Sequence, residues 1–218
     1  MSGRGAWPFF YKLGLDFRNN PQGRDAHGIY ALKKELIHNG YSQGIVATLA
    51  YWGASVDARC REFQRDHGLV VDGQLGPKTA LALFHKRALE QETQFGIPNN
   101  LLCHLKSEES SNDPVAQGFV DTDDEGLVQI NVHFHPEISQ EQAWDPSFCL
   151  PWGAKYLKDA YVFVGNDWDG AVAAYNVGRE AARLWVNAGK PAQGGPSWFP
   201  DAYSRATHYV ALVKASGC

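Results

Sequence analysis

A short segment near the middle of the 218-residue chain constrains the fold more than any other. An apolar run at residues 101–105 follows Pro98-Asn99-Asn100, and Asp113-Pro114 comes soon after it. Asparagine before an apolar run is typical of a helix start, and proline disfavours helical backbone in the residue before it. We therefore expect a short helix between these two signals, with the carboxylates of Glu108 and Glu109 near its end.

The two carboxylates of this expected helix do not point the same way. At about 100° per residue, the mean direction of the leucines in the apolar run lies closer to Glu109 than to Glu108. We therefore expect Glu109 to lean toward the buried side and Glu108 to be its surface neighbour. A carboxyl group in an apolar setting has a raised pKa and can hold a proton near neutral pH, as a general acid must. The alternative is a solvated pair of glutamates, because charged side chains are usually exposed.

The charge of the chain is small but unevenly distributed. The net charge of −4 is too low to favour binding to nucleic acid or to a membrane surface. Residues 1–97 carry 12 Lys and Arg against 9 Asp and Glu, whereas residues 98–218 carry 8 against 15. This change of sign predicts a domain boundary near Pro98.

The apolar segments of the sequence are all short. None approaches the roughly 20 apolar residues of a membrane span, and the aromatic cluster at residues 7–11 is too short for a secretion signal. We therefore expect a soluble protein that is made in the cytoplasm without a signal peptide and does not insert stably into a membrane. If it acts outside the cell, another component must release it.

The four cysteines are Cys60, Cys103, Cys149 and Cys218, and their spacing fits no zinc-binding pattern. Their density is too low for a disulfide-stapled scaffold. We expect reduced, structural cysteines and no metal or other cofactor, with a bridge between Cys103 and Cys149 as the open alternative.

A turn-plus-helix pattern occurs twice in the first half of the chain. Trp52-Gly53 and Leu75-Gly76 each combine an apolar residue with glycine, and each precedes a helical stretch. Another helix is expected over residues 29–38, and residues 1–27 are predicted to form an irregular lead-in. The duplication indicates a small unit of packed helices.

The second copy of this pattern carries a family resemblance. Residues 62–69 read Glu-Phe-Gln-Arg-Asp-His-Gly-Leu, and residues 71–79 read Val-Asp-Gly-Gln-Leu-Gly-Pro-Lys-Thr. This string resembles the type 1 peptidoglycan-binding domain, a small three-helix module found on cell-wall hydrolases. The resemblance covers about residues 28–84 and implies bacterial peptidoglycan as a partner. The first copy lacks the Asp-Gly that the family has before Gly53, so no wall-contacting residue is assigned.

The polar stretch at residues 85–97 has no proline and reaches its only glycine at residue 96. We expect a helical connector there, not a flexible linker. Residues 98–218 would then form a second domain, with further helices over residues 151–164, 169–185 and 203–213.

An acidic stretch at residues 121–125 follows the expected Glu109 helix. Four acids in five positions are typical of a solvated loop. Asp121, Asp123 and Glu125 alternate in the manner of a Ca²⁺ loop, but Val132 stands at the twelfth position, where a bidentate glutamate is needed. Ca²⁺ binding therefore remains a minor alternative.

His133 and His135 form an HxH pair and raise a zinc peptidase as an alternative function. Such a site needs a further histidine and an aspartate upstream. The nearest upstream histidine, His104, has Ser111 seven residues later, where an aspartate would be wanted. We therefore expect surface histidines.

Four segments of the second half share their order and spacing with one superfamily. They are Glu109-Ser110 with Pro114 and Ala116, then residues 126–130, then residues 173–178, then Tyr209-Val210 with Val213. Together they resemble the soluble lytic transglycosylases and goose-type lysozymes over about residues 101–213. The two resemblances imply a mainly α chain in which a small three-helix peptidoglycan-binding domain precedes a lysozyme-like, predominantly helical catalytic domain at residues 98–218.

The superfamily cleaves the β-1,4 bond between N-acetylmuramic acid and N-acetylglucosamine. The resemblance implies that Glu109 protonates the leaving oxygen and later accepts the proton of the sugar's 6-hydroxyl, as a 1,6-anhydro ring closes. Goose-type lysozymes instead use acidic residues to activate water. Asn131 aligns with one such position and is not acidic, so Asp121 or Asp123 would be the base of a hydrolytic muramidase.

Further residues match family positions that line the sugar groove. These are Gln129, Tyr175 and Asn176, with Asn131 beside them. Amides and phenols there can hydrogen-bond acetamido groups and orient Glu109. The alternatives are a structural amide at Gln129 and core packing at Tyr175.

The complete pattern resembles a phage endolysin, expected to be a monomer that a membrane-permeabilising holin releases onto the wall. Lytic transglycosylation is the expected reaction, and hydrolysis is its alternative. A zinc peptidase and a non-catalytic wall-binding or virion protein are alternatives of other classes.

Overall fold

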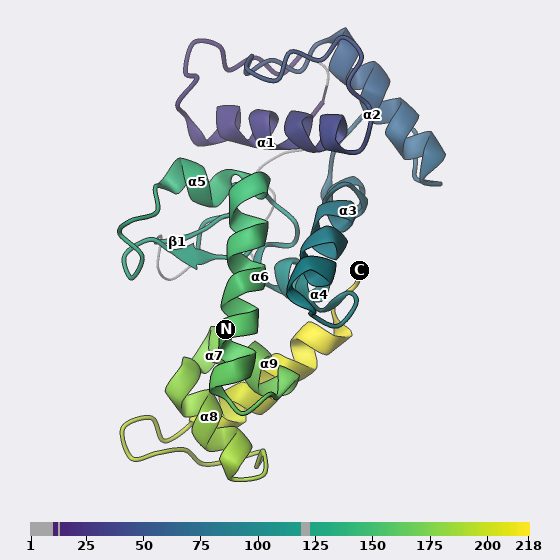
Figure 1. The fold of residues 1–218 in the computed structure, drawn as a ribbon. Coiled ribbons are helices and arrows are strands. Elements are labelled where there is room, and N and C mark those ends of the chain that lie inside the picture. The colour runs from purple at the N-terminus through teal and green to yellow at the C-terminus, as the bar shows by residue number, and fades with distance from the viewer. Residues whose placement is uncertain (1–10, 13, 119–122) are drawn as a thin grey trace.

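The computed structural model describes residues 11–12, 14–118 and 123–218, and in these residues the chain is mainly helical, as predicted (Figure 1). The helices are α1 (Arg24–His38), α2 (Ala54–Asp66), α3 (Pro77–Phe95), α4 (Leu101–Ser110), α5 (Gln140–Trp144), α6 (Pro146–Phe163), α7 (Trp168–Val177), α8 (Arg179–Asn187) and α9 (Ala202–Ala215). An antiparallel hairpin pairs β1 (Asp124–Glu125) with β2 (Ile130–Asn131). Of the helices described, none is both long enough and apolar enough to cross a membrane.

The two turn-plus-helix copies are built alike. Gly53 and Gly76 occupy the N-cap positions of α2 and α3 in an extended conformation, and Trp52 and Leu75 before them are fully buried. Pro77 then opens α3, where its missing N–H leaves no helical hydrogen bond unmade. The buried residue before each glycine fixes the start of each helix against the core.

The segment before α1 is bound to both copies. Tyr11 pairs with Leu75 in an antiparallel bridge, and Asp16 pairs with Tyr51. Tyr11 is fully buried. Part of the predicted irregular lead-in is therefore extended backbone that packs on the helices, and α1 begins at Arg24, earlier than expected.

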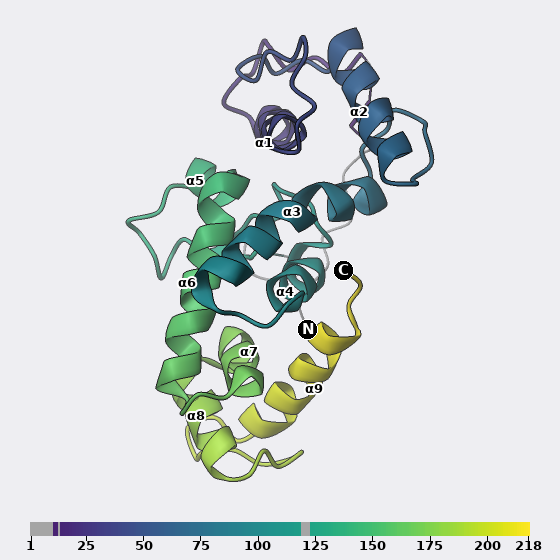
Figure 2. The same cartoon turned by 45° about the vertical axis from the view of Figure 1, so that its right-hand side comes forward.

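Helix α3 is shared by both halves of the chain. Leu83 and Phe84 near its middle are fully buried, and its second half runs beside α4 and α6 (Figure 2). The helix ends at Phe95, where Gly96 takes up a left-handed conformation with φ of 63°. The predicted connector is thus mostly a continuation of α3, and this one helix runs from the first half of the chain into the second.

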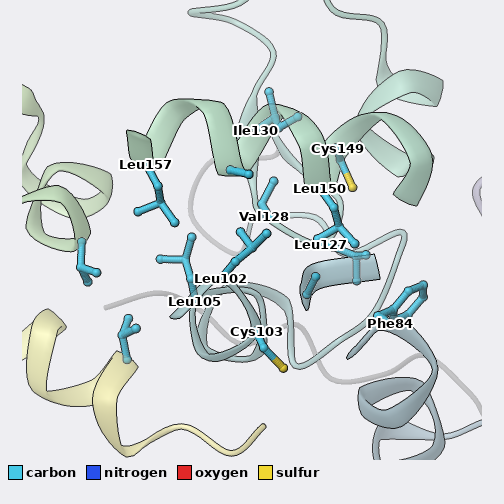
Figure 3. Close-up of a cluster of buried hydrophobic side chains, with 14 of the residues drawn as sticks. Phe84, Leu102, Cys103, Leu105, Leu127, Val128, Ile130, Cys149, Leu150 and Leu157 are labelled. Carbon is cyan, nitrogen blue, oxygen red and sulfur yellow. The ribbon is translucent and has the colours of Figure 1, made fainter. Parts of the chain in front are cut away.

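Helix α4 lies at the centre of the second half, in contact with α3 and α9. Its Leu102 and Leu105 are fully buried and belong to a core with Leu127, Val128 and Leu157 (Figure 3). Full burial of one leucine contributes roughly 1.5–3 kcal/mol. This core fixes the position of the helix that carries the two glutamates.

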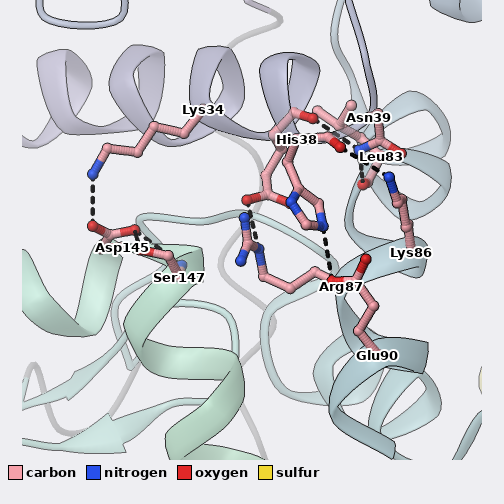
Figure 4. A network of polar contacts seen from close by, with 10 residues as sticks. Lys34, His38, Asn39, Leu83, Lys86, Arg87, Glu90, Asp145 and Ser147 are labelled. Atoms are coloured by element: carbon pink, nitrogen blue, oxygen red, sulfur yellow. Dashed lines mark hydrogen bonds and ion pairs between the residues drawn. The ribbon is translucent and has the colours of Figure 1, made fainter. Parts of the chain in front are cut away.

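Charged side chains join α1 to α3 and to the start of α6 (Figure 4). Arg87 of α3 donates from Nε to Oε1 of Glu35 in α1 at 2.8 Å, and Glu35 is fully buried. Burial raises the pKa of Glu35 to about 7, although Arg87 opposes the rise. Lys34 Nζ lies 2.6 Å from Asp145 Oδ2. Polar contacts therefore reinforce the junction between the two halves.

A disulfide joins Cys103 of α4 to Cys218. The prediction of reduced cysteines is wrong for this pair, and the alternative bridge from Cys103 to Cys149 is not formed. Cys60 and Cys149 are buried thiols. The bridge joins residues 115 positions apart, a proximity that cysteine spacing in the sequence does not reveal.

Candidate active site

A carboxylate from a neighbouring helix holds the start of α4. Glu92 of α3 is buried, and its Oε1 accepts from the backbone N–H of Leu102 at 2.8 Å and of Cys103 at 3.2 Å. Its Oε2 accepts from the N–H of Asn100 at 2.7 Å. A negative charge there satisfies free helix N–H groups and suits the positive end of the helix dipole. The predicted helix is confirmed, but Asn100 makes no side-chain cap and Glu92 supplies one instead.

The chain turns sharply after α4. Ser111 and Asn112 both lie in the left-handed region, with φ of 52° and 67°. Lys106 is fully buried and donates from Nζ to Oδ1 of Asn112. Burial lowers the pKa of Lys106 to about 7. This turn fixes the end of α4, just beyond the two glutamates.

The surroundings of Glu108 differ from those predicted. Glu108 is 2% exposed, and its Oε2 accepts from Ser216 Oγ at 3.0 Å. The prediction of a surface neighbour is wrong because α9 packs against α4 and its C-terminal end covers Glu108. Glu109 itself is only partly exposed.

The carboxylate of Glu109 meets a tyrosine from the last helix. Tyr209 Oη donates to Oε1 of Glu109, and Tyr209 is 3% exposed. Burial raises the pKa of Glu109 to about 7. The Tyr209 hydrogen bond opposes this rise, and the carboxylates of Asp124 and Glu108 add to it. Glu109 is therefore a carboxyl group that can carry a proton near neutral pH.

Tyr175 of α7 lies near the same carboxylate. Burial raises the pKa of Tyr175, and the charges of Tyr156 and Glu109 add to the rise. Its hydroxyl donates to the carbonyl of Gly153 at 3.4 Å. The predicted groove residue Tyr175 is thus brought close to Glu109. Tyr209 is not among the predicted site residues, although its Tyr-Val pair belongs to the fourth segment of the resemblance.

The β1–β2 hairpin brings a further acid toward Glu109. Asp124 is close enough for its charge to raise the pKa of Glu109. Asn131 donates from Nδ2 to Oδ1 of Asp124 at 2.9 Å, so this predicted groove residue orients Asp124. Asp123, one predicted base, is partly exposed just before β1. Asp121, the other, lies outside the described residues.

Glu125 is a buried acid and not part of a solvated loop. Its Oε1 accepts from Gln117 Nε2 at 3.0 Å and from Gln140 Nε2 at 2.5 Å, and its Oε2 accepts from Trp144 Nε1 at 2.8 Å. N–H donors therefore occupy both oxygens, which contradicts the solvated loop at this residue. The same donors leave Glu125 unsuited to bind Ca²⁺.

Two further predicted groove residues are engaged within the protein. Gln129 donates from Nε2 to the carbonyls of Gly126 at 2.9 Å and Ala116 at 3.3 Å, which is the structural-amide alternative. Asn176 Oδ1 accepts from Arg205 Nε at 3.3 Å, a contact between α7 and α9. Gln129 therefore holds the backbone of the β1–β2 turn, and Asn176 links α7 to α9.

A row of aromatic rings leads along α6 to Tyr175. His135 packs edge-on against Trp152 at 5.0 Å, Trp152 stacks on Tyr156 at 5.5 Å, and Tyr156 meets Tyr175 edge-on at 4.9 Å. We call these four residues the aromatic row. Trp152 and Tyr156 are partly exposed. Helix α6 contacts neighbours on several sides, so its apolar period does not separate core from groove.

Among the residues that the structure describes, the HxH pair belongs to no group of three side chains that could hold a metal ion. His133 is exposed, and His135 Nδ1 lies 3.3 Å from Glu137 Oε1. Within the described part of the chain, the residues close enough together to hold a metal ion are His85, Cys103 and Cys218. The zinc peptidase alternative is therefore not supported.

A pocket of about 760 Å³ lies away from Glu109, between α1 and the α5–α6 corner. His27, Tyr30, Trp144 and Phe148 are among its lining residues. Glu109 does not line this pocket, so the pocket is not part of the candidate active site.

Two family models match the chain. The putative peptidoglycan binding domain matches residues 26–83, and the transglycosylase SLT domain matches residues 87–194. A comparison with curated proteins found no match. The order of the two domains confirms the architecture predicted from the sequence, and the second match includes Glu109, Asp124 and the aromatic row. The chain therefore carries a transglycosylase SLT domain behind a peptidoglycan-binding domain, and it is an enzyme that cleaves glycosidic bonds of peptidoglycan.

Proposed function

We propose that Glu109 is both the general acid and the general base with which this enzyme cleaves the bond between N-acetylmuramic acid and N-acetylglucosamine. The observation that carries the proposal is a half-buried carboxyl group, held by Tyr209, with a pKa raised to about 7 by burial. A group with this pKa is partly protonated at neutral pH, and its carboxylate is basic enough to take a proton back.

Glu109 alone is sufficient for both proton transfers of the reaction. Protonated Glu109 gives its proton to the leaving oxygen of N-acetylglucosamine while the glycosidic bond breaks. The acetamido oxygen of N-acetylmuramic acid bonds to the anomeric carbon, and the acetamido group takes up the positive charge. The Glu109 carboxylate then removes the proton of the 6-hydroxyl, whose oxygen displaces the acetamido group and forms a 1,6-anhydro sugar. Glu109 ends protonated, as it began.

The neighbouring side chains support this chemistry. Tyr209 holds Oε1 of Glu109, which leaves Oε2 for the substrate. The negative charge of Asp124 favours positive charge at the anomeric carbon. Trp152 and Tyr156 are partly exposed aromatic side chains, and aromatic rings suit the apolar faces of sugar rings. We assign these two rings to glycan binding.

A hydrolytic muramidase is the second candidate, and Asp124 favours it. Asp124 interacts electrostatically with Glu109 and is oriented by Asn131, as a base that activates water must be. In this variant of the proposal the base is Asp124, in place of Asp121 or Asp123.

Mass spectrometry of digested peptidoglycan separates the two reactions. Transglycosylation gives N-acetylmuramic acid ends that are lighter by one water than the reducing ends left by hydrolysis. We expect anhydro ends, and we expect Asp124→Asn to change the rate without changing the product. Reducing ends as the main product, lost in Asp124→Asn, would instead establish the hydrolytic reaction.

The pH dependence of cleavage should follow the protonation of Glu109. A general acid is active while protonated, so activity should fall as the pH rises through about 7. Tyr209→Phe removes a hydrogen bond that favours the carboxylate, so it should raise the pKa of Glu109 and move the falling limb to higher pH. The measurement is the initial rate of wall clearing against pH. As a control, Tyr203→Phe on the same helix should leave the pH at which activity falls unchanged. If this pH stays the same or decreases in Tyr209→Phe, the assignment of Glu109 is contradicted.

We infer the biological role from the sequence resemblance. It stays a prediction that this protein is a phage endolysin, that it acts as a monomer and that a holin releases it. The match to a peptidoglycan-binding domain supports the bacterial wall as the partner.

A further inference from the structure

Three metal-ligating side chains from distant parts of the chain meet at the start of α4. His85 lies on α3, Cys103 on α4, and Cys218 beyond the end of α9. One ligand atom of each lies within 4.8 Å of the others. We propose that these residues form a Zn²⁺ site when the Cys103–Cys218 disulfide is reduced.

The ligand set and its spacing suit zinc. Tetrahedral Zn²⁺ binds thiolate sulfur at about 2.3 Å and imidazole nitrogen at about 2.0–2.1 Å, which places neighbouring ligand atoms about 3.5–3.8 Å apart. The ligand atoms of His85, Cys103 and Cys218 lie within 4.8 Å of one another, and two of them are the sulfurs of the disulfide, so a small separation of these sulfurs opens space for the ion. Two thiolates and one imidazole form a ligand set known for zinc, with one position left for water or another oxygen.

The surroundings allow the sulfurs to separate. Cys103 is buried in the first turn of α4 and stays in place, whereas Cys218 is exposed at the end of the described chain. His85 is partly exposed, and its Nε2 lies 3.2 Å from Oδ1 of Asn100. The Sγ of Cys218 lies 3.8 Å from the same oxygen. Asn100 therefore offers an oxygen atom beside the fourth position.

The chemistry balances with a thiol reductant and a zinc ion. Two molecules of a small thiol reduce the disulfide to two cysteine thiols and become a disulfide themselves. Zn²⁺ then replaces the two thiol protons, which pass to solvent, and the neutral imidazole of His85 completes the protein ligands. In the reverse direction a small-molecule disulfide accepts the two electrons and two protons and becomes two thiols, the Cys103–Cys218 disulfide forms again, and the metal is released.

This site would keep the same elements together in both redox states. Cys103 belongs to the helix that carries Glu109, and Cys218 follows the helix that carries Tyr209, its hydrogen-bond partner. In an oxidising compartment the disulfide joins them, and in a reducing one zinc takes its place. The zinc site does not depend on the catalytic role of Glu109.

Metal titration of the full chain tests the proposal. The chain is reduced with a phosphine, freed of reductant without air, and titrated with Zn²⁺ against a chromogenic chelator. We expect one zinc per reduced chain and none on the oxidised chain. Co²⁺ in place of Zn²⁺ should give the ultraviolet charge-transfer absorption of thiolate ligands.

Variants locate the metal. Cys218→Ser and His85→Gln lie at partly or fully exposed positions and should each weaken Zn²⁺ binding at least about tenfold, because each removes one ligand. Cys60→Ala removes a buried thiol elsewhere and should bind zinc like the parent chain. A reduced chain that binds no zinc overturns the proposal. So does a Cys218→Ser chain with unchanged affinity and charge-transfer absorption, and circular dichroism confirms that each variant is folded.

Discussion

Glu109→Gln is expected to lower the rate of peptidoglycan cleavage by about 10²–10⁴-fold, the range that a positioned proton donor contributes. Glutamine keeps the shape of the side chain and can still accept the Tyr209 hydrogen bond, but it has no acidic proton to give. The measurement is loss of turbidity in a suspension of bacterial walls. Binding of the variant to sedimented walls should remain, because the matched peptidoglycan-binding domain lies at residues 26–83.

The neighbouring glutamate provides the matched control. Glu108→Gln makes the same chemical change one residue away, and its amide oxygen can still accept from Ser216. It should retain most of the parent activity. If Glu109→Gln cleaves walls at the parent rate, or if both variants lose activity equally, Glu109 is not the proton donor.

Glu92→Ala should lower the free energy of unfolding by about 3 kcal/mol. The substitution removes a buried carboxylate that accepts three backbone N–H groups at the start of α4. Hydrogen bonds to charged groups contribute about 1.5–3 kcal/mol each, and part of this loss is recovered where water reaches the freed N–H groups. The measurement is equilibrium unfolding in urea, followed by circular dichroism.

An exposed glutamate on the same helix serves as the comparison. Glu90 pairs with His38 at 2.9 Å at the surface, so Glu90→Ala should change stability by less than about 1 kcal/mol. Equal losses for Glu92→Ala and Glu90→Ala would show that Glu92 does not hold the start of α4.

Local sequence signals predict most of the helices. The asparagines before residue 101 and the Asp-Pro pair after residue 112 enclose α4, and Gly-Pro at residues 76–77 begins α3. These signals act through hydrogen bonds and backbone preferences within about four residues, so they are visible in the sequence. The family segments add the candidate acid, because their order and spacing single out Glu109.

Predictions of exposure from local sequence are wrong where a distant part of the chain packs on the residue. The apolar run before Glu108 indicates which face of α4 is apolar, but it contains no information about α9, which covers Glu108. The acidic stretch has the composition of a solvated loop, yet Gln117, Gln140 and Trp144 bury Glu125 among N–H donors. The number of charged residues in a segment does not reveal the hydrogen-bond donors that other segments of the chain supply.

The sequence by itself determined a helical chain with two domains in a known order, and it identified Glu109 as the candidate acid. The tertiary structure alone decided what surrounds that acid. Tyr209 reaches Glu109 across 100 positions, Cys218 reaches Cys103 across 115, and Asp124 stands near Glu109. The pKa of a carboxyl group depends on burial and on charges within a few ångströms, and only packing brings those groups together.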